Sequence, residues 1–269
     1  MNIGFASVER LPSVIELFMN GPHLATGRLE TGNPNLNSET SNNFDITFNY
    51  DNGDFYAMAS FYVNDVDNYI TLQDMHDDHD DHDDHDDHDD DHGDDDHDDH
   101  DDHGDEHDDH DKEFAHLIKS NYVQEDAEFR GYELEIGRTF SLGSGDLTLS
   151  FGRDEVDAEF SDGHNVPRIN PARNIYTLSY VESDWVFKLI LKDVESQNDV
   201  GEGETKTDSY QMLDTRLTRT FNVGEQSELK LSIFGSNLLD EVARNHSSFV
   251  KNEVPLAGRN YGAKFSYRF

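Results

Sequence analysis

Eleven histidines are concentrated in one short segment of the sequence, between positions 76 and 110. The first five recur at every third residue, separated by pairs of aspartates, in the repeat His-Asp-Asp. Imidazole nitrogens bind zinc, copper and nickel well, and carboxylates add negative charge and hard oxygen ligands. Because both groups recur at short spacing, the segment predicts many weak and interchangeable metal sites. The eleven residues are His76, His79, His82, His85, His88, His92, His97, His100, His103, His107 and His110.

Four further histidines stand apart from this segment, and each is a candidate for an additional metal ligand: His23, His116, His164 and His246. A single histidine in a loop is more often an ordinary surface residue than a ligand. Dense carboxylates raise the pKa of neighbouring histidines above about 6.5. Because a protonated imidazole cannot bind a metal ion, we expect the acidic segment to lose most of its zinc at about pH 5.

An alternative interpretation of the acidic segment is a solvated, disordered run without function. Calcium is a rival ion for the carboxylates, but it does not use imidazole ligands. The regular recurrence of histidine therefore favours capture of a transition metal. Affinity alone would favour copper over zinc, so the segment itself leaves the identity of the metal open.

The charge of the chain is concentrated in the same place. The formal net charge is −39, and the 23 aspartates and one glutamate between Asp74 and Asp111 leave only −15 for all other residues. A field of this sign repels nucleic acid, so we expect no nucleic-acid partner. The chain has no cysteine, and it contains no nucleophile motif, phosphate-binding loop or zinc-protease motif. We therefore expect neither enzymatic activity nor a prosthetic group.

The elements that would position this segment are strands with alternating apolar and polar residues. At the C-terminus, apolar residues occupy every second position from Tyr261 to Phe269, and polar residues or glycine stand between them. Such alternation places one face of a strand on lipid and the other on water. The same period recurs at 44–50, 55–63, 132–136, 147–151, 176–180, 185–191, 213–221 and 229–233, and a further strand precedes Arg10.

Ten strands are thus predicted, and the connections between them alternate in length. Short turns fall near 51–54, 143–146, 182–184 and 222–227, and long loops near 10–40, 73–117, 160–171, 196–207 and 239–258. Outer-membrane β-barrels have short periplasmic turns and long extracellular loops. The pattern predicts an all-β, transmembrane antiparallel β-barrel. Since plugged transporters have about 22 strands, these ten would form the C-terminal half of such a barrel.

Three motifs resemble those of TonB-dependent outer-membrane receptors. They are Glu9-Arg10-Leu11-Pro12-Ser13 followed by Glu16-Leu17-Phe18, Gly32-Asn33-Pro34-Asn35-Leu36 leading through Glu39 to Ser41-Asn42-Asn43, and Asn237-Leu238-Leu239-Asp240-Glu241 before the terminal strand. Two segments are similar to zinc-uptake (ZnuD-like) receptors in particular, namely Asn20-Gly21-Pro22-His23-Leu24-Ala25-Thr26-Gly27 and Arg244-Asn245-His246-Ser247-Ser248-Phe249. The segment from Val166 to Arg173 also resembles this family.

The resemblance implies import of a metal ion, with zinc as the expected cargo, across the outer membrane of a Gram-negative bacterium. Residues 1–269 would be the C-terminal part of the barrel, with 74–111 as a disordered extracellular loop and the C-terminus in the periplasm. No signal-peptide pattern precedes the first strand, so we expect the signal peptide and the plug domain to be absent from this chain.

The resemblance also implies three partners: outer-membrane lipid, the TonB-ExbB-ExbD complex through the plug, and the barrel assembly machinery through the strand that ends at Phe269. Alternatives that remain open are a metal-buffering surface barrel, a truncated receptor remnant, and a receptor for copper, an iron siderophore or haem.

Overall fold

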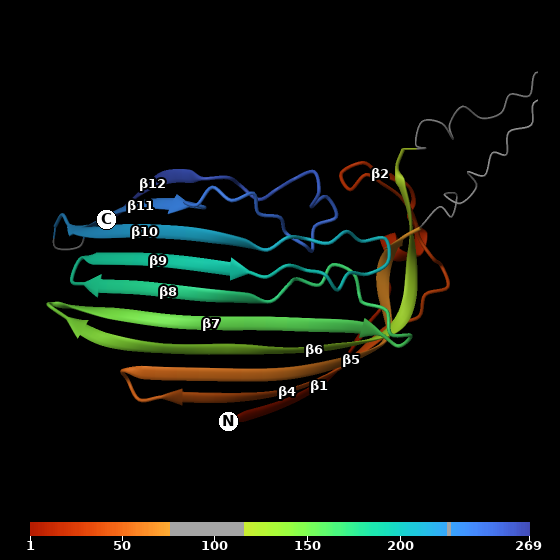
Figure 1. Cartoon of the computed structure of the whole chain (residues 1–269), viewed down its shortest axis with the longest axis horizontal. Coiled ribbons are helices and arrows are strands. Elements are labelled where there is room, and N and C mark those ends of the chain that lie inside the picture. Colours follow the sequence, from red (N-terminus) through yellow and green to blue (C-terminus); the bar gives the residue numbers. More distant parts are fainter. Residues whose placement is uncertain (76–115, 225–226) are drawn as a thin grey trace, which may run out of the picture.

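The computed structural model describes residues 1–75, 116–224 and 227–269. Within these residues it contains twelve β-strands and one short helix. Ten of the strands form one antiparallel sheet in the order β1-β4-β5-β6-β7-β8-β9-β10-β11-β12 (Figure 1). None of the described helical residues forms a helix long and apolar enough to cross a membrane. The prediction of an all-β, antiparallel fold is confirmed.

Each of the ten predicted segments corresponds to one strand of this sheet, and only Phe269 of the last segment falls outside its strand. The strands are β1 (Asn2–Arg10), β4 (Glu39–Asp51), β5 (Phe55–Asp74), β6 (Ile118–Leu142), β7 (Gly145–Phe160), β8 (Arg173–Glu182), β9 (Trp185–Val194), β10 (Tyr210–Asn222), β11 (Glu228–Ser236) and β12 (Asn260–Arg268). Strands β5 and β6 are much longer than the alternating stretches that predicted them. A membrane-spanning β-strand needs about 9–11 residues, whereas β5 has 20 residues and β6 has 25.

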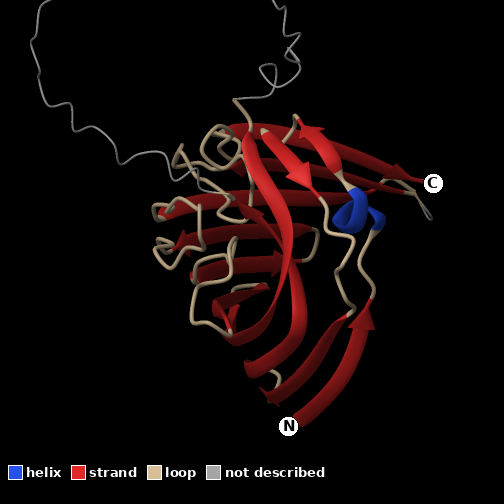
Figure 2. Cartoon of the chain, turned by 90° about the vertical axis from the view of Figure 1, so that its right-hand side faces the viewer, coloured by secondary structure: helices blue, strands red, loops and turns tan. Residues whose placement is uncertain are grey.

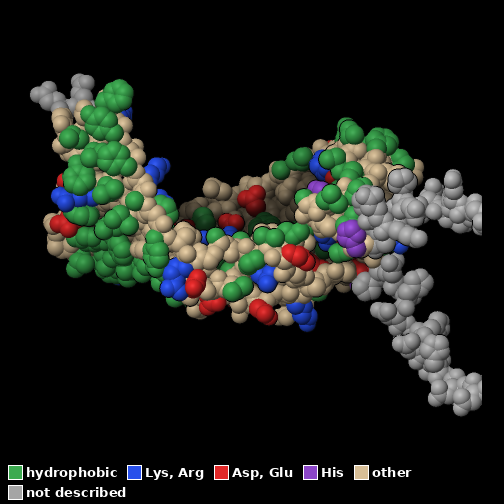
Figure 3. Space-filling model, turned by 90° about the horizontal axis from the view of Figure 1, so that it is seen from above, with side chains coloured by type: hydrophobic (Ala, Val, Ile, Leu, Met, Phe, Trp, Pro, Cys, Tyr) green, Lys and Arg blue, Asp and Glu red, His purple; other side chains and the backbone are tan. Residues whose placement is uncertain are grey.

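The sheet curves into an open wall (Figure 2). Among the described residues, β1 pairs only with β4 and β12 pairs only with β11, so these two strands form the edges. The N-terminus lies at one edge and the C-terminus at the opposite side of the sheet. The concave side of the wall is hollow, and carboxylate side chains are visible inside it (Figure 3).

The two faces of the wall differ in chemistry, as the alternation predicts. On the outer face, Phe44 and Phe61 are 47% and 46% exposed. On the inner face, hydroxyl side chains pair across neighbouring strands, for example Thr47 with Ser60 at 3.0 Å and Thr218 with Ser232 at 2.8 Å. The outer face therefore offers large apolar side chains, and the inner face offers groups that hydrogen-bond to water or to a polar partner.

Within the ten-stranded sheet, the short turns lie at one end of the strands and the long connections at the other (Figure 1). At the turn end, Gly53 has a φ of 94° and Gly143 a φ of 66°, conformations that favour glycine. At the other end, which we call the loop end, a small apolar core holds the connection between β7 and β8 against the inner face. It consists of Ala127, Ala158 and Val166, with Tyr69, Phe129, Phe160 and Ile169 packed around it.

The first long connection is more ordered than expected, because it contains helix α1 (Val14–Phe18) and the hairpin of β2 (Asn20–His23) and β3 (Arg28–Thr31). A capping box starts the helix: the Ser13 hydroxyl accepts from the Glu16 amide, and the Glu16 carboxylate accepts from the Ser13 amide. Strand β3 then runs parallel to the beginning of β6. This part of the chain thereby joins the loop end of the sheet.

Candidate functional site at the loop end

The eleven histidines from His76 to His110 lie outside the described residues. The four isolated candidates all lie in connections at the loop end, but they do not form one site. His23 ends β2, His116 precedes β6, His164 follows β7, and His246 lies between β11 and β12. Among residues 1–75, 116–224 and 227–269, no group of three or more His, Cys, Asp or Glu side chains could hold a metal ion.

The acidic segment leaves the sheet at the end of β5 and returns at the start of β6. These two strand ends remain paired, because Asp74 lies opposite Ser120 and the Met75 amide donates to the Lys119 carbonyl at 2.8 Å. The two strands are therefore hydrogen-bonded right up to the residues that flank the acidic segment. Its base is therefore a defined part of the loop end.

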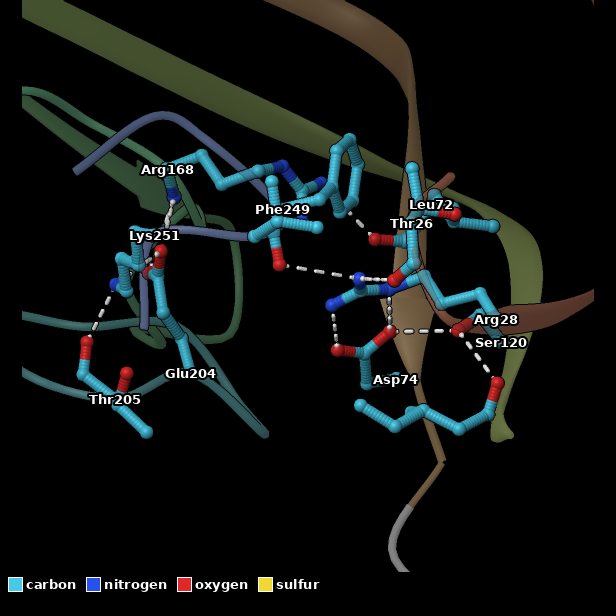
Figure 4. Close-up of polar contacts among 12 residues, drawn as sticks. Thr26, Arg28, Leu72, Asp74, Ser120, Arg168, Glu204, Thr205, Phe249 and Lys251 are labelled. Atoms are coloured by element: carbon cyan, nitrogen blue, oxygen red, sulfur yellow. Dashed lines mark hydrogen bonds and ion pairs between the residues drawn. The ribbon is translucent and has the colours of Figure 1, made fainter. Parts of the chain in front are cut away.

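Arg28 of β3 holds this base through a bidentate ion pair with Asp74 (Figure 4). Nε donates to Oδ1 at 2.8 Å and Nη2 donates to Oδ2 at 2.6 Å, and the Ser120 hydroxyl adds a bond of 2.6 Å to Oδ1. The two charged side chains are only 7% and 13% exposed. Burial alone would raise the pKa of Asp74, but the hydrogen bonds from Arg28 and Ser120 outweigh it and hold the pKa below its ordinary value.

Phe249, from the connection between β11 and β12, lies between two guanidinium groups (Figure 4). The Arg28 and Arg168 Cζ atoms are 4.6 and 4.2 Å from the centre of its ring, both within the range of a cation–π interaction. Arg168 also donates to the Thr71 hydroxyl and the Leu72 carbonyl of β5, at 3.1 and 3.0 Å. Phe249 therefore connects the last long loop to the base of the acidic segment.

Glu204 and Lys251 extend this arrangement into a buried polar network. The Lys251 ammonium group donates to the Glu204 carboxylate at 3.2 Å, to the Thr205 carbonyl at 2.6 Å and to Nδ1 of His246 at 3.2 Å. The Glu204 carboxylate also accepts from the Arg168 amide at 3.0 Å. We call Arg28, Asp74, Arg168, Glu204, His246, Phe249 and Lys251 the loop cluster. It joins four connections and the base of the acidic segment.

Glu204 keeps its charge over a wide pH range. Burial alone would raise the pKa of Glu204, but the adjacent His246 side chain, the Arg168 amide and the Lys251 charge lower it to about 2. A carboxyl group with a depressed pKa contributes stability that is complete above its ordinary pKa of 4.5. This contribution declines as the pH falls through about 2. Glu204 therefore remains ionised at about pH 5, where we expect the acidic segment to release its metal.

His246 is a structural member of this cluster in the present structure. Its side chain is only 1% exposed. Nε2 lies 3.1 Å from the Glu204 carboxylate, and Nδ1 lies 2.8 Å from the Thr207 hydroxyl. Nδ1 is thus hydrogen-bonded, whereas Nε2 is buried beside the Glu204 carboxylate without a hydrogen bond to any described residue.

His23 and His164 are arranged differently, because each has one ring nitrogen paired and is substantially exposed. Nδ1 of His164 lies 2.6 Å from the Asp162 carboxylate, which raises the pKa of His164. Nδ1 of His23 lies 2.8 Å from the Glu30 carboxylate. In both residues Nδ1 is paired, and Nε2 has no hydrogen bond or ion pair with another described residue.

A cavity of about 490 Å³ adjoins His23 at the loop end. Met19, His23, Glu30, Tyr122 and Arg168 are among the residues that line it. Sequence analysis identified His23 but missed Glu30, which is seven residues away and reaches the imidazole only because β2 and β3 form a hairpin. It also missed Arg28, Glu204 and Lys251, for which the sequence carries no periodic or motif signal, and it gave no role to Phe249, which ends the segment 244–249.

Comparison with known proteins extends these observations. Residues 3–238 match the family model described as TonB dependent receptor-like, beta-barrel. The fold is similar to the solved structure of the copper transporter OprC, with a TM-score of 0.68 and 19% sequence identity over 98% of this chain. It is also similar to the FrpB iron transporter from Neisseria meningitidis, with a TM-score of 0.54, 13% identity and 88% of this chain covered.

A third similar structure is the siderophore receptor PirA from Pseudomonas aeruginosa, with a TM-score of 0.55, 14% identity and 99% of this chain covered. The chain spans 36%, 31% and 39% of the length of these three proteins. At these identities the likeness concerns the fold, and the ten-stranded sheet corresponds to a part of each larger protein.

Proposed function

The chain belongs to the TonB-dependent receptor β-barrel family, and from this premise we propose that it forms the C-terminal wall of a receptor that imports zinc across the outer membrane of a Gram-negative bacterium. The acidic segment would capture the ion at the mouth of the barrel. The observation that carries the proposal is the position of this segment: eleven histidines are inserted between β5 and β6 at the end where every long connection lies.

The chemistry of the two faces supports a role in a membrane. The apolar outer face suits lipid, and the polar inner face suits a hydrated passage or a polar domain inside the barrel. Strands β1 and β12 have unpaired outer edges among the described residues, and each unsatisfied backbone group costs several kcal/mol in lipid. The wall would therefore be completed by further strands of a barrel of about 22 strands, which surround a plug domain.

The same reasoning supplies orientation and partners. In an outer-membrane barrel the long connections are extracellular and the short turns are periplasmic, so the C-terminus would lie in the periplasm. The terminal strand would be read by the barrel assembly machinery. The plug of the complete receptor would contact TonB-ExbB-ExbD, which supplies the energy for import. No enzymatic reaction is part of this proposal.

We propose zinc as the imported metal because residues 20–27 and 244–249 resemble zinc-uptake receptors. The solved structure with a TM-score of 0.68 is that of a copper transporter, and imidazole ligands alone bind copper more tightly than zinc. Copper import is therefore the second candidate. A third is a surface barrel that buffers metal without transport.

Uptake of radioactive zinc distinguishes these candidates. Cells that express the complete receptor and are starved of zinc should accumulate the ion, and dissipation of the proton-motive force should stop accumulation. An excess of copper should compete only at the surface. Uptake of copper without zinc would support the second candidate, and binding that is unaffected by loss of the proton-motive force would support metal buffering.

A further inference from the structure

The charged side chains of the inner face are divided between two groups of strands. Glu133 of β6 lies opposite the inner-face residue Ser60, and Asp154 of β7 lies opposite Glu133. On the same face of β4, Asp45 lies two residues before Thr47. Among the described residues of β4 and β7, no inner position holds lysine or arginine. The inner face of β4 to β7 is therefore acidic.

Strands β9 to β12 carry mainly the opposite charge on this face. Arg216 of β10 lies two residues before the inner-face residue Thr218, and Lys188 of β9 lies directly opposite Arg216. Lys264 of β12 lies opposite Ser232, which also belongs to the inner face. Two further cations occupy inner positions on β11 and β12. We call the five cations the basic strip: Lys188, Arg216, Lys230, Lys264 and Arg268.

Most of the basic strip lacks an anionic partner on this wall. The Lys230 ammonium group lies 2.8 Å from the Glu228 carboxylate. In contrast, Lys188, Arg216 and Lys264 form no ion pair with any residue that the structure describes. Like charges directly opposite each other on neighbouring strands destabilise a sheet. An anion placed against Lys188 and Arg216 would therefore remove an unfavourable interaction that the wall itself does not relieve.

A cavity of about 280 Å³ opens beside this like-charged pair, and Lys188, Arg216 and Phe234 are among the residues that line it. The Arg216 Cζ atom lies 5.7 Å from the centre of the Phe234 ring, within the range of a cation–π interaction. Asp214 also lines the cavity, but its carboxylate lies 3.9 Å from the Lys192 ammonium group. A guanidinium group can donate two parallel hydrogen bonds to one carboxylate. The cavity therefore offers both the room and the donors for an incoming carboxylate side chain.

We propose that the basic strip is the docking surface for an acidic face of the plug domain, an inference that rests on the proposed function as a plugged receptor. The concave side of the wall is hollow (Figure 3), and the plug would fill it. Complementary charges across an interface fix the orientation of two partners and exclude wrong ones. The basic strip attracts carboxylates, whereas Glu133 and Asp154 repel them. The plug is thereby held in one rotational setting inside the wall.

The test compares variants of the complete receptor in a lipid bilayer, with hydrogen exchange of the plug as the readout. Lys188→Gln combined with Arg216→Gln should accelerate the exchange of plug amides by about tenfold or more, because the docked state loses two charge pairs. Exchange in β9 and β10 should not accelerate, since the same substitutions remove the repulsion between these strands. A general folding defect would instead accelerate exchange in the plug and in both strands, and it would overturn the inference.

Lys206, an exposed residue of the connection between β9 and β10, supplies the matched control. Lys206→Glu changes the net charge by the same amount as the double variant, but it should leave plug exchange unchanged. Added salt should accelerate plug exchange in the native receptor, because it screens the attraction, and should have less effect in the double variant. Plug exchange that is equal in the native receptor and the double variant would overturn the inference, as it would if the strip held only a small anion. Equal acceleration by Lys206→Glu would overturn it as well.

Failure of the inference and failure of the proposed function give different results. A native receptor that takes up zinc, combined with a double variant whose plug exchanges normally, removes only the docking role of the basic strip. A native receptor that does not take up zinc, combined with a double variant whose plug exchanges faster, removes zinc import and leaves the docking surface in place.

Discussion

Replacing the eleven histidines between positions 76 and 110 by asparagine should raise the zinc concentration for half-maximal uptake by more than about tenfold, since even the partners of metal ligands are worth 10–100-fold in affinity. Asparagine keeps a polar side chain but lacks the imidazole nitrogen. The maximal rate at plentiful zinc should be unchanged, because transport through the barrel does not depend on capture once zinc is abundant. Uptake of radioactive zinc over a range of concentrations measures both quantities.

The control variant keeps the histidines and replaces eleven aspartates of the same segment by asparagine. It removes much of the field that concentrates divalent ions above the mouth, an effect confined to about 8 Å at physiological salt. The change in half-maximal zinc concentration caused by the aspartate substitutions should therefore shrink as salt is added. The change caused by the histidine substitutions should persist at high salt. Unchanged half-maximal concentration in the histidine variant would eliminate the capture role.

The structure also determines where a deletion should begin. A deletion that starts at Asp74 would remove the partner of Arg28 as well as the metal ligands. Met75 also belongs to the paired base, because its amide bonds the Lys119 carbonyl. A deletion from His76 onward is therefore the cleaner counterpart to the asparagine substitutions, since it removes histidines and leaves the base paired.

Arg28→Ala should open the base of the acidic segment. The substitution leaves the buried Asp74 carboxylate without its bidentate partner, and loss of one member of a buried ion pair costs about 3–5 kcal/mol. It also removes one of the two guanidinium groups that contact Phe249. Hydrogen exchange should become faster in β3, at the end of β5 and at the start of β6, with little change at the turn end of the sheet.

Arg130→Ala is the matched control for this experiment. Arg130 pairs with Glu128, but its side chain is 68% exposed, so its removal should leave exchange in these strands unchanged. If Arg28→Ala and Arg130→Ala have the same effect, the loop cluster does not stabilise the base of the segment.

The sheet could be predicted because lipid and water impose a period of two on the residues that face them. The alternation in 44–50 and 261–269 was sufficient to find β4 and β12. The parts of β5 and β6 at the loop end were missed. A bulge between Val66 and Tyr69 shifts the register there, and the residues beyond it pack against loops. Where both faces of a strand meet protein, the period of two disappears.

The candidate site was predictable only where one residue type is repeated. The His-Asp segment is evident from composition, and the four isolated histidines could be named as possible ligands. Their environments could not be predicted: Arg28 and Asp74 are separated by 46 positions, and Arg28 and Phe249 by 221 positions. The capping box of Ser13 and Glu16 was a local signal for α1 that could have been recognised.

We expect the alternation to place the outer face of the wall on lipid and the inner face on water. The chain contains no cysteine, so this part of the complete receptor adds no background when single spin-labelled cysteines are placed at successive positions from Phe44 to Tyr50. The labelled receptor is then measured in a bilayer. Relaxation by dissolved oxygen, which concentrates in lipid, should peak at Phe44, Ile46, Phe48 and Tyr50. A water-soluble nickel complex should instead reach Asp45, Thr47 and Asn49. Loss of this two-residue alternation, with the aromatic positions shielded from oxygen, would contradict the account.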